Sequence, residues 1–445
     1  MLAFVVLCSV FTGLLVGVFP ALIGARTPLS DVLRAGGRAA TTSAGGRRAR
    51  SVLVVLELAM SVVLLAGAGL VVRSFWKLQQ VDLGFTPDHL LTAEVTVSLP
   101  NDRSLGKYVA AAPRLLFFEE ILKRVAALPG VQSVTASNGV PLRDDAFEGV
   151  VTIEGHSVAN PSQMPRVTPH PVTEAYFATM QTKLVRGQGV SDRDRLGMPI
   201  NVVISETAAR HLFPNEDPIG KRMKRGPADS PAPWMTIVGI ARDAKLKSAD
   251  ADPGNVMYIS LAQSPPITMA IFVRTAQDPA SLSTQLVNTI HSVDPDQPVY
   301  RVVPMETVVS AAIGQRRFSA WLFVAFAVLA LGLAAVGVYG LIAQSVAQRR
   351  REIGLRMALG ADPTAVLRLI VRDALSLASA GIVLGLMLSL LLTRLLASQL
   401  FNVSAYDPIV LVAVGPVLLL VAVAASYVPG RAASRLNPVT ALQSE

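Results

Sequence analysis

Few residues of this chain combine the types and the spacing that enzyme chemistry requires. The sequence contains no H-E-x-x-H, no G-x-S-x-G and no Cys/His cluster, and its five histidines are scattered. They are His89, His156, His170, His211 and His291. The acidic pair Asp144-Asp145 indicates a solvated loop rather than a metal site, and PNEDPIGKRM lacks the first glycine of a nucleotide-binding loop. We therefore expect no enzyme activity, no cofactor and no metal site, and no segment that could hold the phosphates of ATP.

One acidic residue, Glu57, lies well inside an apolar run. Acids within membrane spans are costly and are therefore candidates for a functional role. Glu57 is about two helical turns from the basic end of its run, so its carboxylate could reach the membrane interface. The alternative is that it pairs with an arginine of a basic segment farther along the chain.

That basic segment is QRRREIGLRMALGADPTAV, residues 348–366, which joins two apolar runs and contains three consecutive arginines. Gly360 is a natural helix end, Asp362 can accept hydrogen bonds from free helix N–H groups, and Pro363 is tolerated at a first helical position. The pattern predicts a short helix, a tight break and then a second helix that leads into the next apolar run.

The predicted short helix has two different sides. Glu352 and Arg356 are four residues apart with the acid first, which is the favourable order for a helical ion pair. Ile353, Met357 and Gly360 share the opposite side and would form a small apolar face. Such a helix suits docking onto a cytoplasmic protein. It could equally be a basic anchor that contacts only lipid headgroups, and the residues alone leave both interpretations open.

The composition places these segments in a membrane protein. Of 445 residues, 51% are hydrophobic and 16% are charged, whereas soluble domains contain about a quarter charged residues. The net charge of +9 could suggest nucleic acid, but the arginines cluster beside apolar runs without interleaved aromatic residues. We therefore predict no nucleic-acid partner. The single cysteine, Cys8, excludes an intrachain disulfide and fits a small buried hydrophobic residue.

Five apolar runs are long enough to cross a bilayer, which needs roughly 20 residues. They are 3–24, 52–72, 319–343, 374–396 and 408–428. Arginine is concentrated in three of the segments between or after them, at Arg26, Arg34, Arg38, Arg47, Arg48 and Arg50, then at Arg349, Arg350, Arg351, Arg356, Arg368 and Arg372, and finally at Arg431 and Arg435. Basic residues in short loops mark the cytoplasmic side, and all three segments agree with one alternating topology.

This topology gives a complete predicted organisation. It consists of a span at 1–25, a basic cytoplasmic linker at 26–50, a span at 51–74, an extracytoplasmic domain at 75–315, a span at 316–345, a cytoplasmic segment at 346–372, spans at 373–397 and 408–429, and a cytoplasmic tail at 430–445. The N-terminus would lie outside and the C-terminus inside.

The polar block at 75–315 has the pattern of an α+β domain. FFEEILKRVAALPGV and ASLSTQLVNTIHSV have helical spacing. QSVTAS, VTIEGH, NVVIS, MTIVGIA, VMYIS and MAIFVRT are short runs with strand character, bounded by Gly, Pro, Asp or Asn. We therefore expect an integral membrane α-helical protein with a large α+β extracytoplasmic domain of two lobes.

An internal similarity suggests an origin for the first span. PALIGARTPLSDVL, from Pro20, aligns with PGRAASRLNPVTAL, from Pro429, and the offset also aligns Arg26 with Arg435 and Leu33 with Leu442. The alternative is a chance similarity of two membrane-exit segments. We favour the interpretation that residues 1–25 are the last span of a preceding copy of the same module.

Several motifs together resemble one transporter family. QRRREIGLRMALGADPTAVLRLIVRDAL is similar to FtsX-like permease domains of the MacB class of ABC transporters, and VVISETAARHLFPNEDPIGKRM with MTIVGIARDAK resembles the MacB-like periplasmic core domain. RSVLVVLELAMSVVLLAGAGLVVRSFWKLQQVDLGF and PGRAASRLNPVTALQSE fit the same family. The resemblance implies an ATPase-contacting segment that includes Arg349, Arg350, Arg351, Glu352, Ile353, Arg356, Met357 and Gly360.

The resemblance also implies a function and a set of partners. The expected protein is a permease subunit in the bacterial inner membrane that couples ATP hydrolysis by a separate cytoplasmic ABC ATPase to export of peptides, drugs or lipoproteins. A second permease half or a homodimer, and a periplasmic adaptor, are the other implied partners. MacB has an N-terminal ATPase domain that this sequence lacks, so the chain resembles the second half of a duplicated permease. The alternative function is an FtsX-like membrane-anchored sensor that controls periplasmic cell-wall enzymes.

Overall fold

The computed structural model describes residues 44–98, 106–143, 147–156, 160–359, 362–394 and 400–435. The predicted span at 3–24, Asp144-Asp145, Gly360 and most of the tail lie outside the described residues. The chain divides into two compact units. One contains residues 1–74 and 319–445, which we call the helical unit, and the other contains residues 75–318, which we call the outer unit.

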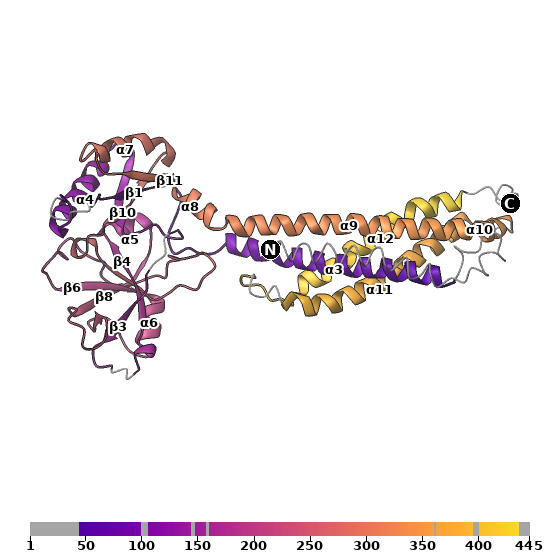
Figure 1. The fold of residues 1–445 in the computed structure, drawn as a ribbon, viewed down its shortest axis with the longest axis horizontal. Helices are drawn as coiled ribbons and strands as arrows, with labels where there is room; N and C mark the ends of the chain where they lie inside the picture. The colour runs from indigo at the N-terminus through magenta and orange to yellow at the C-terminus, as the bar shows by residue number, and fades with distance from the viewer. Residues whose placement is uncertain are drawn as a thin grey trace. The chain divides into compact units, whose positions relative to one another are not determined.

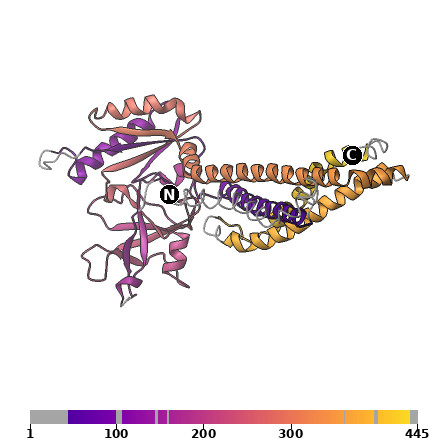
Figure 2. The ribbon, with the colours of Figure 1, turned by 45° about the vertical axis from the view of Figure 1, so that its right-hand side comes forward.

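The helical unit contains four helices that are long and apolar enough to cross a membrane. They belong to α3 (Ala44–Gln79), α9 (Gly314–Gln348), α11 (Pro363–Leu392) and α12 (Pro408–Ser434). A short helix, α10 (Arg350–Ala358), follows α9. Four of the predicted apolar runs therefore lie in apolar helices, and Figures 1 and 2 both show α3 alongside α9.

Small residues allow these helices to approach closely. A Cβ atom added to Gly381 of α11 would lie 2.5 Å from Cβ of Leu58, and one added to Gly385 would lie 2.5 Å from Cβ of Val62 and 2.7 Å from the carbonyl oxygen of Ala59. The glycines thus admit α3 directly against α11. Such small residues are typical of helix interfaces in membranes, where packing rather than the hydrophobic effect drives association.

Helix α12 continues beyond the end predicted for the last span. It passes through Pro429 and ends at Ser434, although proline removes a helical hydrogen bond and usually kinks or ends a helix. Pro429 and Gly430 are buried, and a Cβ atom on Gly430 would lie 2.7 Å from Cδ1 of Leu367 in α11. Close packing on α11 therefore accompanies the continuation of the helix.

The outer unit is an α+β domain. Its strands are β1 (Leu90–Thr96), β2 (Val131–Ser137), β3 (Gly149–Ile153), β4 (Arg166–Val172), β5 (Leu184–Gly187), β6 (Ile200–Ser205), β7 (Arg222–Arg225), β8 (Met235–Ala241), β9 (Val256–Ser260), β10 (Thr268–Thr275) and β11 (Val299–Pro304). Its helices are α4 (Ala111–Ala126), α5 (Tyr176–Met180), α6 (Glu206–Leu212), α7 (Ser283–His291) and α8 (Met305–Ala312). The predicted helices in FFEEILKRVAALPGV and ASLSTQLVNTIHSV are confirmed, as are the six predicted strands.

The strands form one sheet, and the strands from β4 to β9 in its order close into a ring. The order is β11-β1-β10-β2-β4-β3-β7-β8-β6-β9, with β5 paired to β8, and β9 also pairs in parallel with β4. Strands β4, β3, β7, β8, β6 and β9 therefore form a closed ring. Its seam between β3 and β4 is short, because only Gly149 with Val167 and Val150 with Arg166 are in register there.

The buried residues of the outer unit form two hydrophobic clusters. One packs α4 and α7 onto β1, β2 and β10, and both views show these two helices at the same end of the outer unit (Figures 1 and 2). The other takes residues from every strand of the ring and from α6. Both are cores of the kind that a layered domain needs.

Candidate coupling segment

The basic segment forms a nearly continuous helical path with a bend at Arg349. Helix α9 ends at Gln348 and α10 begins at Arg350, and Arg349 between them has φ −96° and ψ 11°. The Arg349 N–H donates to the Ser345 carbonyl at 3.1 Å, and the Ile353 N–H donates to the Arg349 carbonyl at 2.9 Å. Helical hydrogen bonding thus continues across the bend, which ties the position of α10 to that of α9.

The predicted start of the following helix is confirmed. Helix α11 begins at Pro363, and the side chain of Asp362 accepts a hydrogen bond from the Thr364 N–H at 3.1 Å. The hydrogen bonds that the Thr364 hydroxyl and the Thr364 N–H donate to this carboxylate lower the pKa of Asp362 below its ordinary value. The cap fixes where the chain turns from α10 into α11.

The described residues of the apolar face predicted for α10 pack against the core of the helical unit. Ile353 is only 6% exposed and joins Val366 and Ile370 in the core of the helical unit, and Met357 packs against the same core. The spacing correctly identifies Ile353 and Met357 as one apolar side of the short helix, but that side turns inward onto α11, where burial removes it from water. The exposed apolar side chains are instead Leu355, 52% exposed, and Leu359, 81% exposed.

The charged residues of the segment lie on its solvent side. Nη2 of Arg356 is 2.7 Å from Oε1 of Glu352, so the predicted ion pair is confirmed. Nη1 of Arg349 lies 3.4 Å from Oδ2 of Asp373 in α11, a partner that the sequence analysis missed. Both pairs are exposed, and such pairs contribute only about 0–1 kcal/mol. Arg350 is also exposed, whereas the Arg351 side chain and Gly360 are outside the described residues.

Glu57 packs against α9 and does not form the predicted ion pair with a described arginine. Among the described side chains no arginine lies within ion-pair distance of it, and its Oε2 would be 2.3 Å from a Cβ atom placed on Gly337 of α9. The absence of a side chain at Gly337 therefore makes room for the carboxylate. One turn away, the Ser61 hydroxyl lies 3.1 Å from the Ala330 carbonyl and 2.9 Å from that of Glu57. Both contacts place Glu57 at the packing surface of α3 and α9.

The helical unit is a helix bundle with an exposed, charged helix at one end, and the outer unit is inserted in the sequence between α3 and α9. Within the described ranges, no group of three or more His, Cys, Asp or Glu side chains could hold a metal ion. The family profile for the MacB-like periplasmic core domain matches residues 51–291, which is more than half of the chain, and the profile for the FtsX-like permease C-terminal domain matches residues 324–438.

The chain belongs to the MacB-like family of ABC transporter permeases. It is 23% identical over 366 residues to the macrolide export ATP-binding/permease protein MacB of Mannheimia succiniciproducens, covering 74% of this chain and 54% of that protein. It is 24% identical to the ABC transporter permease YknZ of Bacillus subtilis, covering 78% of this chain and 84% of YknZ.

This MacB-like permease also aligns with solved extracytoplasmic domains. One of them is the crystal structure of the periplasmic region of MacB from Actinobacillus actinomycetemcomitans. The alignment covers 51% of this chain and 94% of that structure, with 14% identity and a TM-score of 0.34. The chain spans about half the length of the MacB relative named above. Members of this permease family are transporter subunits, and the chain is a membrane protein with an extracytoplasmic domain.

Proposed function

We propose that this MacB-like permease is the membrane subunit of an export system that is driven by a separate cytoplasmic ABC ATPase. The coupling segment, Arg349 to Gly360, would contact that ATPase, and the outer unit would change shape in response. The substrate classes that this family resemblance suggests are peptides, drugs and lipoproteins. The macrolide export for which the relative MacB is named fits this proposal.

The arrangement of α10 is the observation that carries the proposal. Ile353 and Met357 attach α10 to the bundle core, while Leu355 and Leu359 point outward among exposed charges. A force applied to the outward side would therefore pass into α11 through a buried contact. The ion pair between Arg349 and Asp373 is a second link between the bend and α11.

We also propose the finer features of the topology. The protein has five spans, of which residues 3–24 form the first, and its N-terminus lies outside and its C-terminus in the cytoplasm. Its outer domain has two lobes, built on the two hydrophobic clusters. The proposal also includes the predicted domain boundaries, a second permease half or a second copy of the chain, and a periplasmic adaptor. The concentration of arginine in the three predicted inner segments supports this orientation.

The test is a substitution on the outward side of the coupling segment. We expect Leu359→Asp to reduce co-purification of an ABC ATPase with the full-length permease at least tenfold, because burying a carboxylate at an apolar contact costs several kcal/mol. Met357→Asp is less informative, since that side chain packs on the bundle core and the substitution would disturb the bundle itself.

Leu116→Asp is the matched control, because Leu116 is also a largely exposed leucine, on α4 of the outer unit. It should leave the ATPase yield unchanged. Wild-type recovery of the ATPase with Leu359→Asp would show that this side of α10 does not dock it.

A further inference from the structure

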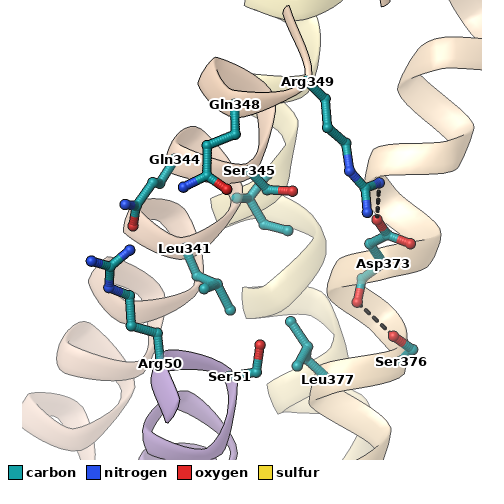
Figure 3. Close-up of a pocket in the computed structure, with 11 residues that line it drawn as sticks. Arg50, Ser51, Leu341, Gln344, Ser345, Gln348, Arg349, Asp373, Ser376 and Leu377 are labelled. Carbon is teal, nitrogen blue, oxygen red and sulfur yellow. Dashed lines mark hydrogen bonds and ion pairs between the residues drawn. The ribbon is translucent and has the colours of Figure 1, made fainter. Parts of the chain in front are cut away.

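A polar cavity of about 190 Å³ lies at the basic end of the helical unit. Arg50 and Ser51 of α3 line it together with Ser345 and Gln348 of α9 and Asp373 of α11. Figure 3 shows Arg50, Gln344 and Gln348 on one side of this cavity and the pair of Arg349 and Asp373 on the other. The volume is several times the roughly 30 Å³ that one water molecule occupies in the liquid.

The polar groups around this cavity have unused hydrogen-bonding capacity. Within the described part of the chain, no hydrogen bond or ion pair involves the side chains of Arg50, Ser51, Gln344, Ser345 or Gln348. Polar side chains that gather in a helix bundle without mutual partners leave their donors for solvent or for a ligand. Two guanidinium groups against one carboxylate give the lining an excess of positive charge.

This set of donors selects an anion with several acceptor oxygens. Arginine binds phosphate well because its planar fork presents paired N–H donors, and the neutral amide and hydroxyl groups can supply further donors. Asp373 would repel an anion, but it lies beside Arg349, which offsets its charge. The remaining favourable charge is that of Arg50, which is only partly exposed.

The surface beside the cavity indicates which kind of molecule would carry the phosphate. Directly after Arg50 and Ser51, α3 exposes the apolar side chains Val52, Leu53 and Leu56. The chain therefore passes within one turn from a polar cavity to a surface suited to lipid tails. Basic pockets between transmembrane helices are known to bind lipid head groups. We propose that this cavity binds the phosphate of an anionic phospholipid, whose acyl chains lie along α3.

Such a lipid would connect the first turns of α3 to the bend between α9 and α10. The proposal rests on the membrane location of the helical unit and is independent of the ATPase partner. Its failure would leave the proposed transport function untouched, and loss of ATPase docking would leave the lipid site in place.

Binding is tested on the full-length protein in detergent by native mass spectrometry during titration with phosphatidylglycerol. We expect Arg50→Gln to weaken binding of one phosphatidylglycerol molecule about tenfold, as loss of a charge-assisted hydrogen bond predicts. Arg48→Gln is the matched control, because Arg48 is exposed on the same helix and does not line the cavity. Asp373→Asn should strengthen binding, because it removes the negative charge from the lining.

Two further measurements keep the proposal falsifiable. Gln348→Ala changes no charge and should weaken phosphatidylglycerol binding severalfold, which covers the case in which Arg50→Gln does not fold. Inorganic phosphate at millimolar concentration should not displace the lipid, because it has no acyl chains. The proposal would be overturned if wild type, Arg50→Gln and Gln348→Ala bound phosphatidylglycerol equally well. Displacement of the lipid by inorganic phosphate would also overturn it.

Discussion

At the scale of single residues, His170 shows how the outer unit keeps an ionisable group neutral. His170 of β4 is 5% exposed, and its Nε2 lies 3.2 Å from the hydroxyl of Tyr176. Its ring meets those of Tyr176 and Tyr258 edge-on, at centroid distances of 5.5 and 5.8 Å. Burial among these rings lowers the pKa of His170 to about 4, because the charged imidazolium loses its hydration there.

The depressed pKa of His170 predicts acid sensitivity of the outer unit. Between pH 6.5 and about 4 the unfolded chain binds a proton that the folded chain does not, so stability is present above pH 6.5 and falls as the pH drops through this window. The loss amounts to roughly 3 kcal/mol at its full extent. Thermal unfolding of the full chain, followed by near-ultraviolet circular dichroism, measures it.

His170→Gln is the control for this effect, because glutamine can keep a hydrogen bond to Tyr176 but does not titrate. The stability of wild type relative to that of His170→Gln should fall as the pH drops from 7 to 4. A difference that stays constant over this range would contradict the assigned burial of a neutral imidazole.

The residues of α10 show where sequence patterns stop being informative. The spacing of Ile353 and Met357 correctly identifies one apolar side of the helix, but periodicity does not say which neighbour covers that side. In the structure the neighbour is α11 of the same chain, so the side exposed to a partner is the opposite one. The pairing of Arg349 with Asp373 was missed for the same reason, since it depends on packing that brings together two residues 24 positions apart in the sequence.

At the scale of elements, the local sequence patterns predict most helices and strands. The closure of the strands into a ring depends instead on pairing between segments that are distant in the sequence. Helix α4 and strand β2 follow directly from their apolar spacing and their Pro-Gly boundary. The closed ring requires β4 and β9 to pair in parallel across many residues, and no local signal encodes that contact. The close packing of Gly430 against Leu367, where α12 continues through Pro429, is likewise a contact between helices that no local pattern encodes.

The close approach of α3 and α11 gives a prediction about a single methyl group. In Gly385→Ala the new Cβ would overlap Cβ of Val62 and the carbonyl oxygen of Ala59, so the two backbones must move apart. Overpacking of this kind typically costs 1–3 kcal/mol. We expect the thermal midpoint of the detergent-solubilised protein to fall by several degrees.

Two glycines of α9 provide a graded comparison. Gly332→Ala places its methyl group in open space within the described structure and should leave the thermal midpoint unchanged or slightly raised. In Gly337→Ala the three atoms nearest to the new Cβ belong to the carboxyl end of the Glu57 side chain, which can rotate away, so the effect should be intermediate. Equal midpoints for Gly385→Ala and Gly332→Ala would refute the close packing of α3 on α11.

At the scale of the whole molecule, charge and apolarity are divided between the two units. The helical unit concentrates long apolar helices, and its arginines gather in the segment that joins α9 to α11 and near the start of α3. The outer unit has conventional cores and surface ion pairs, such as that between Arg186 and Asp217. A protein with this division has two possible orientations in a membrane, and the position of the basic residues predicts one of them.

That orientation can be tested with two introduced cysteines after the native cysteine is removed by Cys8→Ser. Ser404 is exposed in the loop between α11 and α12, and Leu359 is exposed after α10, at the opposite end of α11. If the arginine-rich segments are cytoplasmic, a membrane-impermeant thiol reagent should label Ser404→Cys in intact cells. It should label Leu359→Cys only after permeabilisation. Labelling of Leu359→Cys in intact cells would reverse the topology and would also exclude a cytoplasmic ATPase as the partner of α10.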